Sequence, residues 1–460
     1  MEVKKASLSA TTVLIVVAFF LITLTNASAG TEKVLANFPG AHGGLQPWAG
    51  LVSDAAGNFY GVTYYGGPNG KGEVFRVHYS SATGWSECTA YGFKGGKDGA
   101  APYGGLIFDA AGNLYGTTSA GGFYGEGTVF KLTHTSGCNW TSTVLHQFGN
   151  VEDGNYPAAA LIFDKSGSLY GTTQAGGTHG FGTVFKLQLA SGKWTEHVLH
   201  NFTGTDGSSP WASVTFDRAG NLYGTTATGG KYNYGVVFQL SPASGGKWIE
   251  HVIHTFTGGA DGSEPQAGVV FDSAGNLYSA SVYGGTLTAG NIFELTKQSN
   301  QTWKETVLYN FTGGADGASP WDTPILDSAG NLYGTAYEGG ISYGTVFELT
   351  RTSHGWKETV LYTFHGGSTG RCPVGGLIRD SDGNLYGTAL RGGVDNRGLV
   401  FEITGAGASS AHWTPEGDQG TGGPPIPGET LNHIKWGCPI LPRSVRKGGR
   451  RERTSHKGED

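Results

Sequence analysis

Short runs of alternating apolar and polar residues repeat along most of this chain. Each unit contains four such runs, Pro-x-x-Gly-Leu-Ile-Phe-Asp, Gly-Asn-Leu-Tyr-Gly-Thr-Thr, Gly-Thr-Val-Phe-x-Leu and Trp-x-Glu-x-Val-Leu-x-x-Phe, with the two-residue period of β-strands. The units are 53 or 55 residues apart, a period typical of β-propellers. The repeated tyrosine marks seven units: Tyr60, Tyr115, Tyr170, Tyr223, Tyr278, Tyr333 and Tyr386.

The seventh unit is incomplete, because it stops after residues 399–403 and lacks its fourth run. That run stands at the other end of the repeat region, as residues 33–38. Joining the two ends removes an open sheet edge, which would otherwise invite aggregation. The sequence therefore predicts an all-β fold over residues 31–404, a seven-bladed β-propeller with four antiparallel strands per blade, closed by the N-terminal strand.

The order of the runs predicts the place of each strand within a blade. In the second unit, residues 105–109 are expected to be innermost and residues 140–148 outermost. The loops that connect consecutive blades and the loops between the second and third strands then share one face, here called the top face. These loops are longer and more varied than the others, and function on a rigid scaffold usually lies on such loops.

The two ends of the chain differ from the repeats. Residues 1–29 have a basic start, a short apolar run and the small-residue site Ala27-Ser28-Ala29, which together indicate a signal peptide. The run is short for a membrane span, so we expect no membrane span after signal removal and a secreted location, either extracellular or periplasmic. Residues 405–460 are rich in Gly, Pro and charge, and are interpreted as a low-complexity, disordered tail.

Charge and cysteine content narrow the class of partner. Without the signal (two Lys, one Glu) and the tail (eight basic, six acidic residues), 20 basic and 29 acidic residues remain, a net charge of −9. A nucleic-acid partner requires a basic face, so none is expected. Four cysteines are present without metal-binding spacing. Cys88 and Cys138 fall on outer segments of adjacent blades, and whether they pair is left open.

The repeat resembles a known family. Gly-Asn-Leu-Tyr-Gly-Thr-Thr-x-x-Gly-Gly followed by Gly-Thr-Val-Phe-x-Leu is similar to the Gloeo/Verruco (GloVer-type) tandem repeat of exported bacterial proteins. The resemblance covers the propeller and not the tail, and it implies an extracellular location without an established activity or a catalytic residue. The strand pairs also look like those of other exported propellers, including streptogramin-lyase-like and NHL-like ones, which is an analogy of fold only.

The residue after the proline of each unit varies, and it begins the innermost strand beside the top face. Aromatic rings there could stack on sugar faces, or they could seal the wedge between blades; both interpretations stay open. Four of these residues, Trp48, Tyr103, Trp211 and Trp321, are candidate ligand-binding residues. We call all seven positions the channel ring: Trp48, Tyr103, Ala158, Trp211, Gln266, Trp321 and Val374.

A second candidate site lies where the ring closes. Arg371, Arg391, Asp395 and Arg397 fall in top loops of the last blade, and His42 lies in the loop that leads into the first blade. Arginine binds carboxylates through two parallel hydrogen bonds, so Arg371, Arg397 and His42 could bind an acidic sugar or a protein carboxylate. Ordinary surface charge is the other interpretation.

The repeated aspartates are interpreted as structural. One set, such as Asp109, precedes the first hairpin turn, and another, such as Asp153, lies in the top loops; both are typical of turn residues that accept backbone N–H groups. Calcium binding by the second set is a weaker alternative, because each loop supplies only one or two carboxylates. No His-Glu-x-x-His or phosphate-loop motif is present. No metal, cofactor or catalytic residue is therefore assigned.

Two functions remain as hypotheses. The first is an exported, non-enzymatic binding module that presents aromatic and acidic top loops to a glycan or to a cell-surface or extracellular protein. The alternative is an exported polysaccharide lyase or glycoside hydrolase with its site at the channel mouth. Convergence of several non-repeated polar side chains would favour the enzyme, and their dispersal would favour the module.

Overall fold

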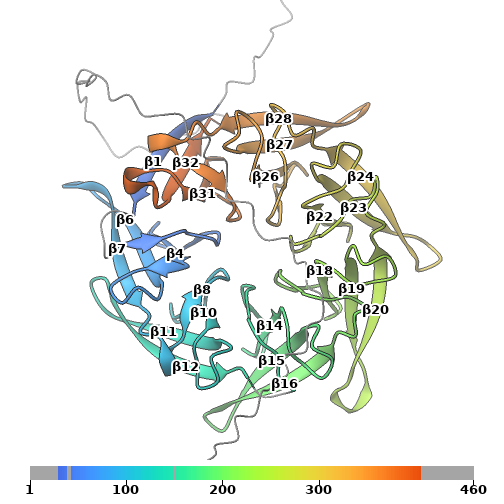
Figure 1. Ribbon diagram of the computed structural model, residues 1–460, viewed down its shortest axis with the longest axis horizontal. Helices are drawn as coiled ribbons and strands as arrows, with labels where there is room; N and C mark the ends of the chain where they lie inside the picture. The colour runs from blue at the N-terminus through green and yellow to red at the C-terminus, as the bar shows by residue number, and fades with distance from the viewer. Residues whose placement is uncertain (1–29, 39–42, 150–151, 406–460) are drawn as a thin grey trace, which may run out of the picture.

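The apolar runs of each repeat pair into one antiparallel sheet, and the sheets stand side by side in a ring (Figure 1). The computed structural model describes residues 30–38, 43–149 and 152–405. Each of the seven sheets is a blade with four antiparallel strands from the channel to the rim, so the predicted seven-bladed propeller is confirmed. The signal segment, His42 and the tail beyond residue 405 lie outside the described residues.

Every blade has the same four-strand order, from a two-residue innermost strand to long outer strands. Blades 2 and 7 each have one additional three-residue strand, β8 (Ala100–Pro102) and β29 (Arg371–Pro373), paired with the second strand of the blade. Blade 1 contains β3 (Val52–Ser53), β4 (Phe59–Thr63), β6 (Glu73–Ser80) and β7 (Gly84–Gly92). Blade 2 contains β8 (Ala100–Pro102), β9 (Ile107–Phe108), β10 (Leu114–Ala120), β11 (Thr128–Ser136) and β12 (Asn139–Gln147). Blade 3 contains β13 (Ile162–Phe163), β14 (Leu169–Thr173), β15 (Thr183–Ala190) and β16 (Lys193–Asn201).

The remaining blades follow the same plan. Blade 4 contains β17 (Thr215–Phe216), β18 (Leu222–Thr226), β19 (Val236–Pro242) and β20 (Trp248–Thr255). Blade 5 contains β21 (Val270–Phe271), β22 (Leu277–Ser281), β23 (Asn291–Lys297) and β24 (Trp303–Asn310). Blade 6 contains β25 (Ile325–Leu326), β26 (Leu332–Ala336), β27 (Thr345–Thr352) and β28 (Gly355–Thr363). Blade 7 contains β29 (Arg371–Pro373), β30 (Ile378–Arg379), β31 (Leu385–Arg391), β32 (Leu399–Thr404) and β1 (Thr31–Asn37).

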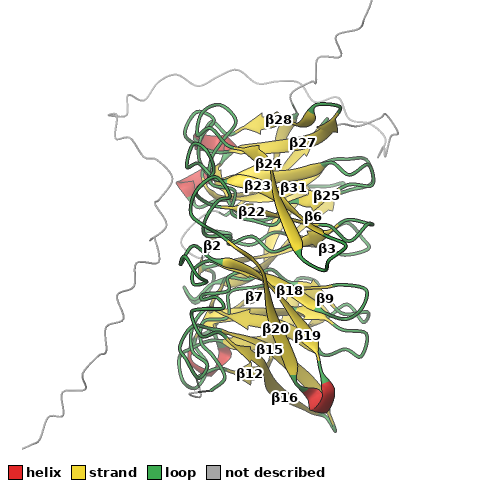
Figure 2. Cartoon of the chain, turned by 90° about the vertical axis from the view of Figure 1, so that its right-hand side faces the viewer, coloured by secondary structure: helices red, strands yellow, loops and turns green. Residues whose placement is uncertain are grey.

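A few short elements lie outside the blades. The pair β2 (Gly44–Leu45) and β5 (Tyr65–Gly66) joins two loops of blade 1. The 3₁₀ turns occupy loops, seen as short red segments in Figure 2: η1 (Gly96–Asp98), η2 (Ser244–Gly246), η3 (Gly367–Thr369) and η4 (Val394–Asn396). Among the described residues, no helix has the length and apolar character needed to cross a membrane.

The first strand of the chain completes the last blade. Strand β1 pairs antiparallel with β32, with Val34 opposite Phe401 and Ala36 opposite Val400. Figure 1 shows this blue strand beside the orange strands of the C-terminal end. The hydroxyl of Thr388 in blade 7 also donates to the carbonyl of Ala49, which follows in blade 1, at 3.1 Å. The predicted closure of the ring is therefore confirmed.

Neighbouring blades are held together by one repeated pair of phenylalanines. The phenylalanine after each outermost strand packs edge-on against the third-strand phenylalanine of the next blade, with ring centroids 4.9–5.2 Å apart. In six blades the residue after the repeated tyrosine is a glycine that lies beneath this ring, and a Cβ at Gly116 would lie 2.7 Å from the Phe130 ring; blade 5 has Ser279 at this position. The seven pairs are Phe38–Phe75, Phe93–Phe130, Phe148–Phe185, Phe202–Phe238, Phe256–Phe293, Phe311–Phe347 and Phe364–Phe401.

The turn between the first and second strands of each blade contains the repeated aspartate. Asp109 Oδ1 accepts the backbone N–H groups of Ala111 and Asn113, and its Oδ2 accepts the Asn113 amide and the Tyr115 hydroxyl, at 2.7–3.0 Å. Burial raises the pKa of Asp109, but these hydrogen bonds outweigh it and hold the pKa below its usual value. The repeated tyrosine donates to the turn aspartate in all seven blades. The structural interpretation of this set is confirmed.

One interface carries an additional covalent bond. Cys88 on β7 and Cys138, between β11 and β12, form a disulfide that joins the outer strands of blades 1 and 2. The sequence left this pairing open. The structure decides it because the two outer strands lie side by side, which brings the two Cα atoms to 6.5 Å although 50 residues separate them in sequence.

Candidate functional site

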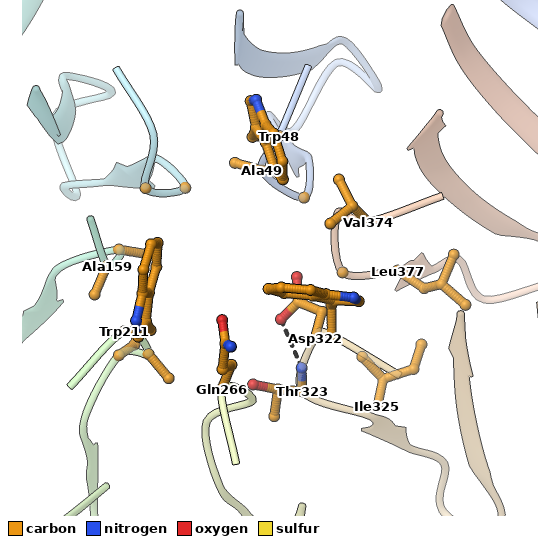
Figure 3. Close-up of a pocket in the computed structure, with 18 of the residues that line it drawn as sticks. Trp48, Ala49, Ala159, Trp211, Gln266, Asp322, Thr323, Ile325, Val374 and Leu377 are labelled. Atoms are coloured by element: carbon orange, nitrogen blue, oxygen red, sulfur yellow. Dashed lines mark hydrogen bonds between the residues drawn. The ribbon is translucent and has the colours of Figure 1, made fainter. Parts of the chain in front are cut away.

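The channel ring lines one cavity at the centre of the propeller. The cavity has a volume of about 630 Å³, which is in the range of sites for small ligands. All seven ring residues line it, together with the first residues of the innermost strands. Figure 3 shows Trp48, Trp211, Gln266 and Asp322 around the same opening. The structure thus brings the four predicted aromatic candidates together.

The aromatic side chains form a partial belt. The rings of Trp48 and Tyr103 are stacked with centroids 5.2 Å apart, and Tyr103 lies 5.7 Å from Trp211. Trp48 and Trp321 also pack against a buried cluster that contains Val374. Trp211 belongs to none of the buried clusters found in the described residues. Trp48 and Trp321 therefore pack against a buried cluster and also line the cavity, whereas Trp211 lines the cavity and lies outside the buried clusters.

The indole N–H groups of Trp48 and Trp321 point into protein. Both Nε1 atoms are enclosed and have no hydrogen-bond partner among the described residues. A buried indole N–H normally finds a partner, so this orientation has a cost. With their polar edges enclosed, the two side chains offer apolar surface to the cavity.

Each ring residue is positioned by a strained turn that the sequence did not reveal. The residue before every ring proline has a positive φ of 52–61° although none is glycine. Such backbone costs about 1–3 kcal/mol and persists only where surrounding contacts impose it. Here its N–H donates to a carbonyl in the preceding top loop, as Ser209 does to Phe181 at 2.9 Å. The seven residues are Gln46, Ala101, Tyr156, Ser209, Glu264, Ser319 and Cys372.

Asp322 is the residue of the site that sequence reasoning missed. It follows Trp321 in blade 6 and is the only carboxylate among the residues that line the cavity. The signal was present, because the other six blades have alanine or glycine at the equivalent position. The equivalent residues are Ala49, Gly104, Ala159, Ala212, Ala267 and Gly375.

Asp322 is held by backbone donors. The N–H of Thr323 donates to its Oδ1 at 2.6 Å, the contact drawn in Figure 3, and the N–H of Gly376 in the next blade also bonds the carboxylate. Enclosure within the protein outweighs these bonds and raises the pKa of Asp322 above its usual value. Burial, with the nearby phenol of Tyr64 and the carboxylate of Asp322, raises the pKa of Tyr103 well beyond its usual value.

Arg371 and Arg397, the described candidates at the seam where the last blade meets the first, lie apart from this cavity. Arg371 donates to Asn396 Oδ1 at 3.3 Å and lies over the Tyr343 ring, and it pairs in register with Arg391 across β29 and β31. Arg397 is partly buried, and its carbonyl accepts the Gln46 N–H at 2.9 Å. Neither Arg371 nor Arg397 lines the cavity. The structure therefore does not join the two predicted groups of site residues.

The aspartates of the top loops organise those loops. Asp98 accepts the Lys94 N–H at 2.8 Å and the Tyr91 hydroxyl at 2.7 Å. In the next loop a histidine replaces the tyrosine, and His146 Nε2 lies 3.2 Å from Asp153. No group of three His, Cys, Asp or Glu side chains in the described ranges is arranged to hold a metal. Turn structure accounts for these residues.

One local motif resembles a serine nucleophile elbow. Residues 366–370 read Gly-Gly-Ser-Thr-Gly. In α/β-hydrolases this motif connects a strand to a helix. Here Ser368 is exposed on the 3₁₀ turn η3, between the outermost strand β28 and β29. The context for a nucleophile is therefore missing at this position.

A known family of repeat proteins matches this chain. The Gloeobacter/Verrucomicrobia repeat family matches residues 18–227 and 212–426. The chain belongs to this family. The match extends over the whole propeller, as the resemblance of the motifs implied. No curated protein matches the sequence.

Solved structures resemble this chain at low sequence identity. An ancestral GH74 enzyme aligns with 81% of this chain at 11% identity and a TM-score of 0.52, and the match spans 49% of that enzyme. A protein provisionally described as a 6-phosphogluconolactonase, from Bacteroides uniformis, aligns with 67% of this chain and 83% of its own, at 14% identity and a TM-score of 0.44. These similarities concern the fold alone.

Proposed function

We propose that this protein is an exported binding module that holds a saccharide in the central cavity. The observation that carries the proposal is the convergence of four aromatic side chains, Trp48, Tyr103, Trp211 and Trp321, on one cavity of about 630 Å³. Flat aromatic faces offer apolar contact at low conformational cost, and a sugar ring presents a matching face of C–H groups. Gln266 and Asp322 add polar groups that can bond hydroxyls.

The top face around the cavity supports an extended ligand. Each of the seven loops between the second and third strands carries at least one exposed apolar side chain. Exposed apolar surface rimmed by polar loops is typical of interaction sites. A polysaccharide or a glycosylated surface protein would contact these loops outside the cavity. One such residue per blade is Tyr65, Phe123, Phe181, Tyr232, Leu287, Ile341 and Val394.

The enzymatic alternative has weaker support. Most glycoside hydrolases use two carboxylates that flank the scissile bond. The lining of the cavity supplies one, Asp322, and the arginines of the seam lie elsewhere. The cavity therefore lacks the second carboxylate of such an enzyme, which favours a binding module. An activity screen on the same oligosaccharides would reveal a lyase or hydrolase directly.

The test is a glycan array on the protein from residue 30 onward, followed by calorimetric titration of Trp211→Ala. We expect binding of at least one oligosaccharide, and a loss of about tenfold in affinity when the Trp211 ring is removed. The melting temperature of Trp211→Ala should differ little from that of the unmodified protein, because the Trp211 ring lies outside the buried clusters of the described residues.

Trp248→Ala is the matched control. Trp248 lies on the outer strand β20 and packs at 6.4 Å from Tyr170 of the preceding blade. Its removal should lower the melting temperature and leave the affinity unchanged. The proposal fails if no saccharide binds, or if Trp211→Ala lowers the melting temperature while saccharide affinity stays the same.

A further inference from the structure

The central cavity contains a carboxyl group, that of Asp322, with no cationic partner among the described residues. Asp322 takes part in none of the ion pairs between described residues. Its partners are the backbone N–H groups of Thr323 and Gly376 and the side chain of Thr323, and the residue is partly exposed. An enclosed carboxylate without a counter-charge is costly, and a cation in the cavity would relieve that cost.

The surrounding rings favour the same sign of ligand. The face of an aromatic ring carries partial negative charge and attracts cations, most strongly for tryptophan. Three tryptophans and Tyr103 line the cavity that Asp322 enters. No Lys, Arg or His side chain is among the lining residues. The excess of 29 acidic over 20 basic residues in the repeat region adds a long-range attraction for cations.

From this geometry we infer that the cavity selects a saccharide that carries a protonated amine, with Asp322 as its counter-charge and the adjacent rings as the surface for stacking. The inference rests on the proposed function and names the ligand class. A hexosamine with a free amino group combines the two features that the site offers, a C–H face for the rings and a cation for the carboxylate. A neutral sugar would use the rings and leave the carboxyl group of Asp322 without a cationic partner.

A purely structural role of Asp322 can be separated from this one. The bond from the Gly376 N–H links blade 7 to Asp322 of blade 6, and an asparagine at position 322 can still accept a hydrogen bond through its amide oxygen. Asp322→Asn therefore removes the charge and keeps an acceptor. Glu152→Gln is the matched control, because Glu152 is an exposed acid in a top loop and its removal changes the net charge of the protein by the same amount.

The experiment compares two tetrasaccharides by titration calorimetry, at a pH where the amines are protonated: β-1,4-linked glucosamine and cellotetraose. At the same position of each sugar ring, the glucosamine tetramer carries an amine and cellotetraose carries a hydroxyl. For the unmodified protein we expect the glucosamine tetramer to bind about tenfold more tightly. Asp322→Asn should remove most of this preference and leave the affinity for cellotetraose unchanged, whereas Glu152→Gln should keep the preference.

The outcomes distinguish this inference from the proposed function. If both tetramers bind the unmodified protein equally, or cellotetraose binds more tightly, the inference is wrong and saccharide binding stands. If the preference survives in Asp322→Asn, the assignment to this carboxylate is wrong. If neither tetramer binds, the inference is wrong, and the glycan array decides separately on saccharide binding. The comparison on the unmodified protein needs no variant to fold.

Discussion

The interfaces between blades and the channel ring occupy the same seven repeats, yet they differ in how far the repeats agree. At the interfaces, seven phenylalanine pairs have centroid distances within 4.9–5.2 Å. In the channel ring the seven equivalent positions are three Trp, one Tyr, one Gln, one Ala and one Val. The backbone turn that positions them is nevertheless the same in every blade.

This difference shows which positions the closed ring requires to be the same in every blade and which positions can vary to form a ligand-binding site. A closed ring needs each interface to match the next, because one poorly packed wedge would open the whole structure. The channel ring is free to vary because its side chains face a cavity. Residues that differ on a repeated backbone, such as Asp322 and Gln266, are therefore the places where selection for a ligand is expected to appear.

The largest effect should come from removing the strand that closes the ring. Deletion of residues 31–38 exposes the edge of β32 and the apolar surface around Phe75. We expect a loss of stability greater than the approximately 3–5 kcal/mol of a single buried phenylalanine. Chemical denaturation followed by circular dichroism measures it. An unchanged midpoint would show that the ring does not depend on its closing strand.

The next effect tests whether the seven interfaces are equivalent. Phe202→Ala and Phe38→Ala each remove a fully buried ring from a phenylalanine pair. Both should cost about 3–5 kcal/mol, measured by denaturant titration. A much smaller cost for Phe38→Ala would mean that the interface made by the N-terminal segment is weaker than the others. The seven interfaces would then not be equivalent.

The disulfide makes one interface different from the rest. Replacing Cys88 and Cys138 together by serine removes a cross-link between residues 50 positions apart. We expect a loss of about 2–4 kcal/mol, because the unfolded chain gains conformational freedom. The double variant of the full protein is compared with the unmodified protein under non-reducing conditions. Equal unfolding midpoints would show that the phenylalanine pairs alone fix this interface.

The smallest expected effect is the pH dependence of the stability contributed by Glu196, which lies on the outermost strand of blade 3. Burial, together with the nearby charge of Asp153, raises the pKa of Glu196 on β16 from 4.5 to about 8. The folded state therefore binds this proton more tightly than the unfolded state, and its stabilisation is lost as pH rises from about 4.5 through about 8. Glu196→Gln mimics the neutral form.

Glu196→Gln should therefore raise stability by about 1 kcal/mol at pH 9 and by less at pH 5, the effect being limited because water screens a partly exposed carboxyl. Melting temperatures across this range measure it, with Glu152→Gln as an exposed control. A gain that is the same at both pH values would exclude titration of Glu196 as its cause.

The sequence by itself determined the architecture, because repeated apolar periodicity reports strands and their order along the chain. The missing run after residue 403 and the extra run at residues 33–38 were sufficient to predict closure. The position after each proline also identified Trp48, Tyr103, Trp211 and Trp321 as neighbours. A repeat places equivalent residues at one radius and height, so their convergence follows from periodicity alone.

Only the tertiary structure showed that Asp322 shares the cavity with these aromatic rings and has no ionic partner among the described residues. The strained turn before each proline depends on a hydrogen bond from the preceding top loop. The Cys88–Cys138 bond depends on outer strands of two blades lying side by side. The environment of Asp322 depends on the aromatic side chains that other blades contribute to the cavity. Such features arise from contacts between residues far apart in the chain, and a local pattern in the sequence does not record them.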